Sequence, residues 1–250
     1  MPSLGELAAH LAPLLDADRY AADGDPAGIW VASERPVRRL ALRIEPGRAP
    51  YGWTDGLDAV LLHRPFGLWP ARLPPDLGVL AYHRALDDEL AIGSRAFASA
   101  MRLEVDDEPL RRDGTAIGLI GARDAPMPVS RMLGELAAAF GGWDEALNAD
   151  DDRPVRRVAL ANAMTDALVR DAAARGAGLY LTGQVRGPAR AAVAETGIAV
   201  VATGQSRAEA WGLREIGRQL ARRWPELAIV DQTGVERSDA GSSDAGSSGG

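Results

Sequence analysis

The sequence PVRRLAL at residues 36–42 returns almost unchanged as PVRRVAL at residues 154–160, an offset of 118 residues. Short apolar runs rich in Val, Ile and Leu are typical of buried β-strands. Two further pairs of segments match in the same order, at slowly increasing offsets: residues 56–63 with 176–183, and residues 78–87 with 197–209. Three ordered matches predict two related halves, and the cleft between them is the natural place for a ligand site.

Outside the repeat, apolar runs alternate with segments of helical periodicity. The predicted strands are residues 37–44, 58–62, 79–82, 117–120, 155–161, 178–181 and 198–202. The predicted helices begin with an amphipathic one that Ser3 and Glu6 would cap, followed by residues 94–103, 130–140, 164–175, 188–195 and 206–224, the last with Ser206 as N-cap. This alternation predicts an α/β fold of two related α/β halves, with mainly parallel sheets that enclose a central cleft.

The predicted domain organisation follows the repeat. Residues 1–125 form the first α/β half, and residues 126–236 form the second, including a linker helix. The acidic stretch at 148–152 is interpreted as a linker. Residues 237–250 contain mainly Gly, Ser, Asp and Ala and have no apolar side chain larger than Ala to bury, which predicts a disordered tail.

The composition excludes several chemistries. The 250 residues contain no cysteine and no lysine, so disulfides, thiolate ligands, a cysteine nucleophile and Schiff-base chemistry are excluded. Only three histidines occur: His10, His63 and His83. A site on this chain must use carboxylates, hydroxyls, arginine, backbone amides and at most three imidazoles.

The formal net charge of −7 argues against bulk binding of nucleic acid or of an anionic membrane, since both require a basic face. No apolar run approaches the roughly 20 residues that span a bilayer. The N-terminus has no positive leader and no small-residue cleavage site. We therefore expect a cytoplasmic protein.

Polar residues with ligand chemistry follow two of the predicted strands. His63 ends the strand at 58–62, and His83 ends the strand at 79–82, with Asp87 four residues later. Glu209 has the place of Asp87 in the second half. One imidazole and two carboxylates that converge on a cleft would suit a hard or borderline cation. From spacing alone the simpler interpretation is favoured, in which each is a lone polar residue satisfied by backbone or water.

Two other features have a structural explanation as well as a functional one. His10 lies beside a leucine stripe of the first helix, where a surface or core-edge histidine is favoured over a ligand. Residues 45–53 contain two prolines and two glycines, which exclude a regular helix there. We interpret this segment as a loop whose Tyr51 and Trp53 either stack over the cleft or, as favoured, simply pack.

Four segments together resemble the motifs of a known family. LLHRPF at 61–66 resembles its His-His-Pro motif, and YHRALD at 82–87 resembles its His-Thr-Asn-Leu-Asp motif. GLYLTGQ at 178–184 is similar to its strand ending in Thr-Gly-Glu, and GQSRAE at 204–209 to its Gly-His-x-x-x-Glu motif. In order and spacing, from about residue 4 to 232, the chain resembles the Ngg-interacting-factor-three-like (YbgI-type) family, whose members are often named GTP cyclohydrolase type 2.

The resemblance implies two similar α/β halves around a two-metal cleft, in a toroidal homohexamer. It implies His63, Asp87 and Glu209 as metal ligands, while Arg64 and Gln205 replace two family histidines. A guanidinium has no lone pair for a metal, and an amide oxygen is a weak donor to a transition metal. The resemblance therefore implies one divalent cation rather than two, with His83, Arg64 and Gln205 lining the site.

Without a metal, Asp87 and Glu209 would be like charges in one cleft, which is costly. We therefore hypothesise that Arg64 answers both carboxylates with charge-assisted hydrogen bonds and so takes the electrostatic place of one metal. Two functions stay open: a metal-binding, oligomeric protein with a depleted dinuclear site, and a metal-dependent hydrolase acting on a nucleotide or phosphorylated substrate. Arg64 would hold a small anionic ligand. No catalytic residue is assigned.

Overall fold

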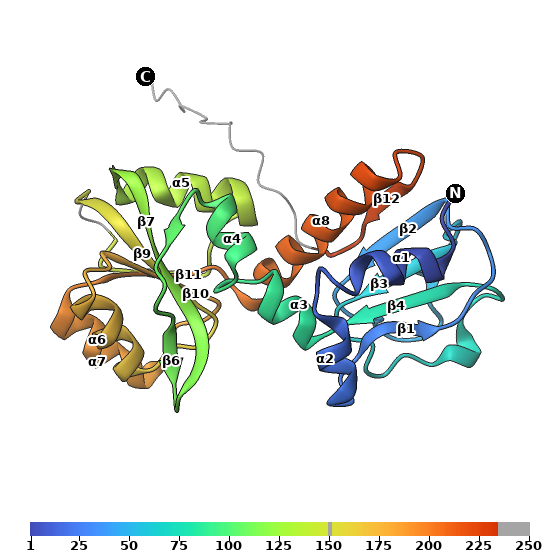
Figure 1. Ribbon diagram of the computed structural model, residues 1–250, viewed down its shortest axis with the longest axis horizontal. Helices are drawn as coiled ribbons and strands as arrows, with labels where there is room; N and C mark the ends of the chain where they lie inside the picture. Colours follow the sequence, from blue (N-terminus) through green and yellow to red (C-terminus); the bar gives the residue numbers. More distant parts are fainter. Residues whose placement is uncertain (150–151, 235–250) are drawn as a thin grey trace, which may run out of the picture.

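Two separate β-sheets, each with its own helices, form the α/β fold of the computed structural model, which describes residues 1–149 and 152–234 (Figure 1). The first sheet has the order β1-β4-β3-β2-β12. Its strands are β1 (Ala27–Val31), β2 (Arg39–Arg43), β3 (Ala59–Leu62), β4 (Gly78–Tyr82) and β12 (Ala228–Asp231). All its neighbours pair parallel except β1, which is antiparallel to β4.

The second sheet has the order β5-β7-β9-β10-β11-β8, with β6 paired to β7. Its strands are β5 (Glu104–Val105), β6 (Leu110–Arg112), β7 (Thr115–Pro128), β8 (Glu145–Leu147), β9 (Pro154–Ala161), β10 (Leu179–Thr182) and β11 (Ala199–Ala202). The inner strands β9, β10 and β11 are parallel, and antiparallel strands flank them. The predicted α/β class, with parallel strands at the centre of both sheets, is confirmed.

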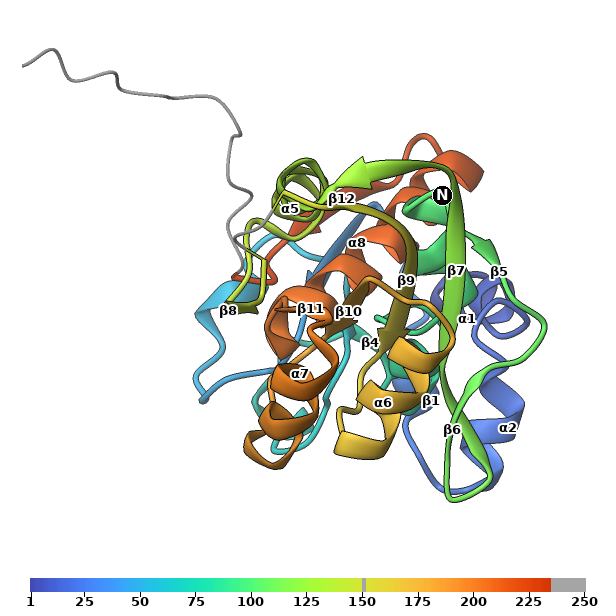
Figure 2. The same ribbon diagram turned by 90° about the vertical axis from the view of Figure 1, so that its left-hand side faces the viewer.

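Helices cover both faces of the second sheet and one face of the first. They are α1 (Leu4–Leu11), α2 (Ala17–Ala22), α3 (Arg84–Glu89), α4 (Arg95–Ala100), α5 (Val129–Phe140), α6 (Asp166–Ala174), α7 (Arg190–Thr196) and α8 (Gln205–Arg223). Single 3-10 turns are η1 (Gly52–Thr54), η2 (Pro70–Arg72) and η3 (Gly187–Ala189). In Figure 2, α6 and α7 lie together on one side of the second sheet and α5 on the other.

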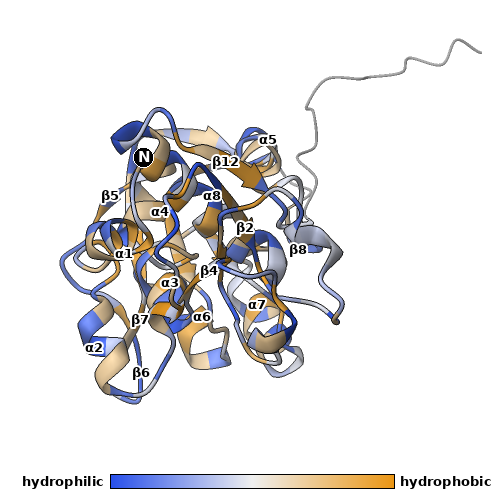
Figure 3. Ribbon diagram, turned by 90° about the vertical axis from the view of Figure 1, so that its right-hand side faces the viewer, coloured by the Kyte–Doolittle hydropathy of each residue, from blue (hydrophilic) through white to orange (hydrophobic). Residues whose placement is uncertain are grey.

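The central strands are buried on both faces, which explains their continuous apolar runs. Every residue of β3, β4, β10 and β11 is buried. In Figure 3 the hydrophobic colour also marks β12, the partly buried edge strand that lies beside β2. The other face of the first sheet is covered by loops, and Tyr51 lies in that cluster at 5% exposure. Tyr51 therefore packs, which is the favoured of our two interpretations, and Trp53 packs beside it.

The arrangement of the parallel strands agrees with the sequence repeat. The units β2-β3-β4 and β9-β10-β11 have the same order along the chain and across their sheets. A helix follows directly in each case, α3 after β4 and α8 after β11. This equivalence supports an internal duplication.

The sheets do not separate at residue 125, where we placed the boundary between the halves. β5, β6 and most of β7 precede that residue and belong to the second sheet, while β12 returns to pair with β2 of the first. The division at residues 125 and 126 stays a prediction about domains. The predicted tail at 237–250 lies outside the described residues.

The helices differ from the sequence expectation in two ways. The N-cap of α8 is Gly204, at φ +90°, so Ser206 lies inside the helix. A residue with a Cβ is strained at this positive φ, so the position favours glycine. The short helices α2 and α3, the latter directly after β4, were not predicted. Among the described residues, no helix is long and apolar enough to cross a membrane.

Candidate metal centre

The carboxyl ends of β3 and β4 place two histidines side by side. β3 ends at Leu62 and β4 at Tyr82, so His63 and His83 each follow their strand directly. Because the two strands are parallel neighbours, their carboxyl ends meet at one edge of the sheet. The ring centroids of His63 and His83 are 5.3 Å apart. The sequence prediction that both lie at strand ends is confirmed.

The N-terminal parts of α3 and α8 supply the carboxylates. Asp87 lies in the first turn of α3, where its backbone N–H donates to the His83 carbonyl at 3.2 Å. Glu209 lies near the start of α8 and is 1% exposed. The His63 Nε2 atom is 3.6 Å from Asp87 Oδ1 and 3.4 Å from Glu209 Oε1. Residues from three elements therefore converge near the centre of the molecule, where α3 and α8 meet in Figure 1.

The His63 ring is oriented by the backbone. Its Nδ1–H donates to the Tyr82 carbonyl at 3.1 Å, since a carbonyl can only accept. In the neutral imidazole this leaves the lone pair on Nε2, which faces the two carboxylates. Among the described residues, His63 Nε2 and Asp87 Oδ1 are buried polar atoms without a hydrogen-bond partner.

Glu209 is held by two donors. The Arg64 Nη2 donates to Glu209 Oε2 at 2.8 Å, and the Gln205 Nε2 donates to Glu209 Oε1 at 3.2 Å. Arg64 also pairs through Nε with Glu45 Oε1 at 3.2 Å. The structure thus brings together the side chains that the sequence placed at the site. Arg64 contacts Glu209, one of the two carboxylates that we expected it to answer, whereas Asp87 Oδ1 has no hydrogen-bond partner.

The electrostatics of the cluster are those of closely coupled charges. Burial by itself would lower the pKa of His63, but Glu209 and Asp87 outweigh it and raise that pKa above the usual value. Burial raises the pKa of Asp87, and the nearby charge of Glu209 adds to this effect. Burial would also raise the pKa of Glu209, but His63, Arg64 and Gln205 together lower it.

The structure adds a residue that the sequence reasoning missed. Asp25 Oδ1 accepts a hydrogen bond from His83 Nδ1 at 2.9 Å. Asp25 lies far from the recognised motifs, and no local pattern marks it, because its partner is 58 residues away. Among the described residues, one group of three side chains has ligand atoms that all lie within 4.8 Å of one another: His63, His83 and Asp87. His83, which we expected only to line the site, belongs to this group.

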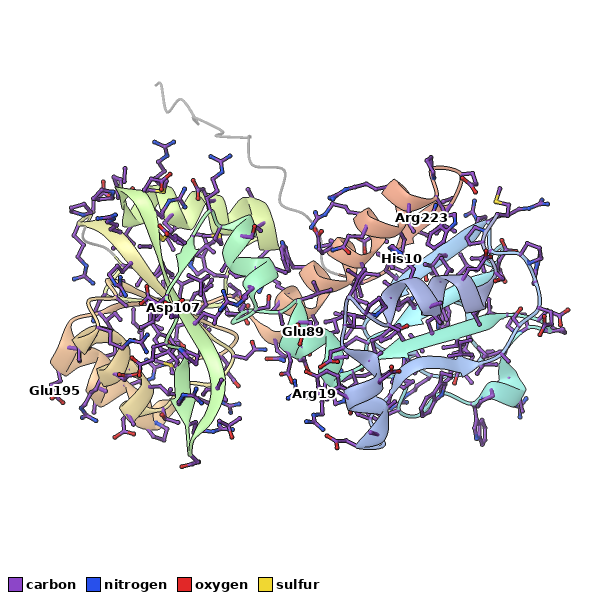
Figure 4. The ribbon with its side chains drawn as sticks, viewed as in Figure 1. His10, Arg19, Glu89, Asp107, Glu195 and Arg223 are labelled. Carbon is purple, nitrogen blue, oxygen red and sulfur yellow. The ribbon has the colours of Figure 1, made fainter. Side chains whose placement is uncertain are left out.

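A cleft of about 460 Å³ borders the site on the side of Asp87. Its wall carries both signs of charge, with Arg19 from α2 and Glu89 from α3 (Figure 4). The third histidine has no part in the site. His10 packs edge-on against Trp224 with ring centroids 5.3 Å apart, and Figure 4 shows it on α1 near Arg223. The prediction of a structural role for His10 is confirmed.

Comparison with known proteins identifies relatives of this chain. It is 27% identical over 231 residues to a protein from Pseudomonas aeruginosa named GTP cyclohydrolase 1 type 2 homolog. The matched region covers 84% of this chain and 91% of that protein. A protein of the same name from Allochromatium vinosum is 25% identical. That match covers 92% of this chain and 97% of the relative.

Solved structures share the fold. Protein ybgI, of unknown function, superposes with a TM-score of 0.67 at 20% identity, over 92% of this chain and 97% of that one. A NIF3 superfamily protein from Sphaerobacter thermophilus has a TM-score of 0.53 at 16% identity, over the same shares of the two chains. The family model of Duf34/NIF3 (NGG1p interacting factor 3) matches residues 71–236. With two thirds of its length matched by that model, the chain belongs to the Duf34/NIF3 family.

Proposed function

We propose that the chain is a metal-binding protein with a depleted dinuclear site, in which one divalent cation is held by His63, Asp87 and Glu209. The observation that carries this proposal is the pair of buried atoms His63 Nε2 and Asp87 Oδ1, 3.6 Å apart and without hydrogen-bond partners. Two ligands that each lie roughly 2.1 Å from one ion are roughly 3–4 Å apart. The separations at His63 suit a single ion.

A second ion does not fit the residues present. The guanidinium of Arg64 contacts Glu209 Oε2 and carries a permanent charge beside the site. Gln205 turns its NH₂ group toward Glu209, so it acts there as a donor and not as a ligand. Both features support one cation rather than two.

The donor set also favours a class of ion. Imidazole with carboxylates suits borderline cations such as Zn²⁺ or Mn²⁺ better than Ca²⁺ or Mg²⁺, which prefer oxygen ligands alone. A cation bound there would supply Lewis-acid polarisation of a ligand oxygen. Around it, the backbone carbonyl of Tyr82 keeps the His63 tautomer, and Arg64 keeps the Glu209 carboxylate in place.

The test is metal analysis of the purified protein, followed by titration with Mn²⁺ and Zn²⁺. We expect one ion per chain, and we expect Asp87→Asn to weaken binding at least about 100-fold because it removes a charged ligand. Asp88→Asn is the matched control, since that neighbouring carboxylate accepts from the Tyr20 hydroxyl at 2.9 Å. Two ions per chain, or none under metal-replete conditions, would contradict the proposal.

A metal-dependent hydrolase acting on a nucleotide or phosphorylated substrate is the second candidate. Arg64 favours it, because its side chain is 29% exposed beside the site and could also anchor an anionic group. The names of the two relatives point in the same direction. Turnover of a panel of nucleotides and phosphate esters by the metal-loaded protein, lost in Asp87→Asn, would establish this activity. The hexamer and the cytoplasmic location stay predictions.

A further inference from the structure

We propose that Asp25 positions His83 as a further ligand of the cation, so that two imidazoles and not one hold it. This inference rests on the proposed function, since it concerns the same ion. It extends the ligand set beyond the three residues proposed above, and it gives a role to Asp25, a carboxylate outside every motif.

The segment around Asp25 is fixed to the start of α3 by three hydrogen bonds. Asp25 Oδ1 accepts from His83 Nδ1 at 2.9 Å, and Asp25 Oδ2 accepts from the Arg84 backbone N–H at 2.8 Å. The His83 backbone N–H donates to the Pro26 carbonyl at 2.9 Å. These contacts continue the antiparallel pairing of β1 with β4, in which Ala27 faces Tyr82. The Asp25 side chain is 10% exposed, so water competes little for it.

The hydrogen bond to Asp25 sets the chemistry of His83. A carboxylate on Nδ1 keeps the proton on that nitrogen and leaves the lone pair on Nε2. Metal-bound histidines commonly donate their other ring N–H to a carboxylate or a backbone carbonyl. His83 does so through Asp25, and His63 does so through the Tyr82 carbonyl. Both rings therefore present Nε2 as the available donor atom.

Packing holds the His83 ring in place from the side. Phe66 lies edge-on to it with ring centroids 5.2 Å apart and an interplanar angle of 87°. The ring of His63 lies 5.3 Å away. The ligand atoms of His63, His83 and Asp87 all lie within 4.8 Å of one another, a spacing that small side-chain shifts close around one ion.

The experiment counts the histidines bound to the ion. Protein with ¹⁵N-labelled histidine is loaded with Mn²⁺, and pulsed EPR measures the nitrogen couplings. The wild type is expected to show two coupled imidazoles. His10, the third histidine, packs on Trp224 and should contribute no nitrogen coupling. His83→Ala is expected to retain the ion with one coupled imidazole. A single imidazole in the wild type would overturn the inference but not the single-ion proposal.

Asp25→Ala tests the positioning role. We expect Mn²⁺ to bind about 10- to 100-fold more weakly and the coupling from one imidazole to be lost or altered. Asp23→Ala is the matched control, because the carboxylate of exposed Asp23 pairs with the Arg84 guanidinium at 3.4 Å, and its loss should change affinity less than about threefold. Equal affinity and unchanged couplings in Asp25→Ala would overturn the role of Asp25. If Asp25→Ala does not fold, the His83→Ala count still decides whether His83 is a ligand. A wild type that binds no ion would contradict the proposed function itself.

Discussion

At position 64 the chain has an arginine whose Nη2 donates to Glu209 Oε2 at 2.8 Å and whose Nε pairs with Glu45. Glu209 is almost fully buried, and a buried carboxylate needs a cation or donors to offset its desolvation. Arg64 provides this charge permanently, whether or not an ion is bound. A protein that relied on a second ion would instead lose the compensation when the ion left.

Arg64→Ala should therefore have two opposite effects. The metal-free protein should lose about 1–3 kcal/mol of its free energy of unfolding, because Glu209 keeps its charge without the partner. Affinity for a divalent cation should rise about tenfold, since a neighbouring positive charge is removed. Denaturant unfolding of metal-free protein and Mn²⁺ titration measure the two effects.

Arg84→Ala is the control for Arg64→Ala, because it removes the same charge from a side chain that pairs with exposed Asp23. It should leave Mn²⁺ affinity nearly unchanged. If Arg64→Ala bound the cation more weakly than the wild type, Arg64 could not be a substitute for a metal.

Strands of the second sheet approach each other so closely at one point that only glycine fits. A Cβ on Gly118 of β7 would lie 2.5 Å from the Leu160 carbonyl oxygen and 2.6 Å from the Ala161 Cβ. These atoms belong to β9, the antiparallel partner of β7. Since a backbone atom cannot move aside like the end of a side chain, β7 and β9 would have to separate locally.

Gly118→Ala should accordingly destabilise the protein by about 2–4 kcal/mol. Gly134→Ala is the matched control. Gly134 lies inside α5, where a Cβ would meet nothing within 4 Å, so alanine should stabilise the helix by up to about 1 kcal/mol. Thermal and denaturant unfolding measure both variants. Equal effects of the two substitutions on stability would show that the contact of β7 with β9 does not restrict the size of the residue at position 118.

The helix α8 connects the two halves into one folding unit. Its first turns contribute Ala208 and Trp211 to the core of the second half, and its later turns contribute Leu213 and Ile216 to the core of the first. The strand β12 then pairs with β2. Because one continuous helix is part of both cores, neither half can unfold without exposing apolar surface of the other.

We expect a single unfolding transition for the whole chain. Leu213→Ala should cost about 2–5 kcal/mol, and hydrogen exchange should speed up in α6 of the second half as well as in α1 of the first. Leu14→Ala is the control, because Leu14 is 44% exposed and its loss should cost little. Faster exchange in the first half alone would show that the halves unfold independently.

The sequence by itself determined the α/β class and the central parallel strands, and it singled out four of the side chains that meet at the site: His63, His83, Asp87 and Glu209. These features depend on local signals. Buried parallel strands have continuous apolar sequences, and residues such as His63 and His83 follow directly after such a run. The resemblance then added Arg64 and Gln205, which stand where the family has histidines, and the structure brings both into contact with Glu209.

Only the tertiary structure decided what each side chain faces. Asp25 reaches His83 because β1 pairs antiparallel with β4, a pairing that short apolar runs do not predict. The strands β5 to β7 join the second sheet, and β12 returns to the first. Both assignments depend on pairing between distant segments in the same way. The orientation of the histidine nitrogens follows from partners 19 and 58 residues away. Local sequence determines which strands and helices form, whereas contacts between distant segments are selected by the packing of the whole chain, and these contacts orient the side chains of the site.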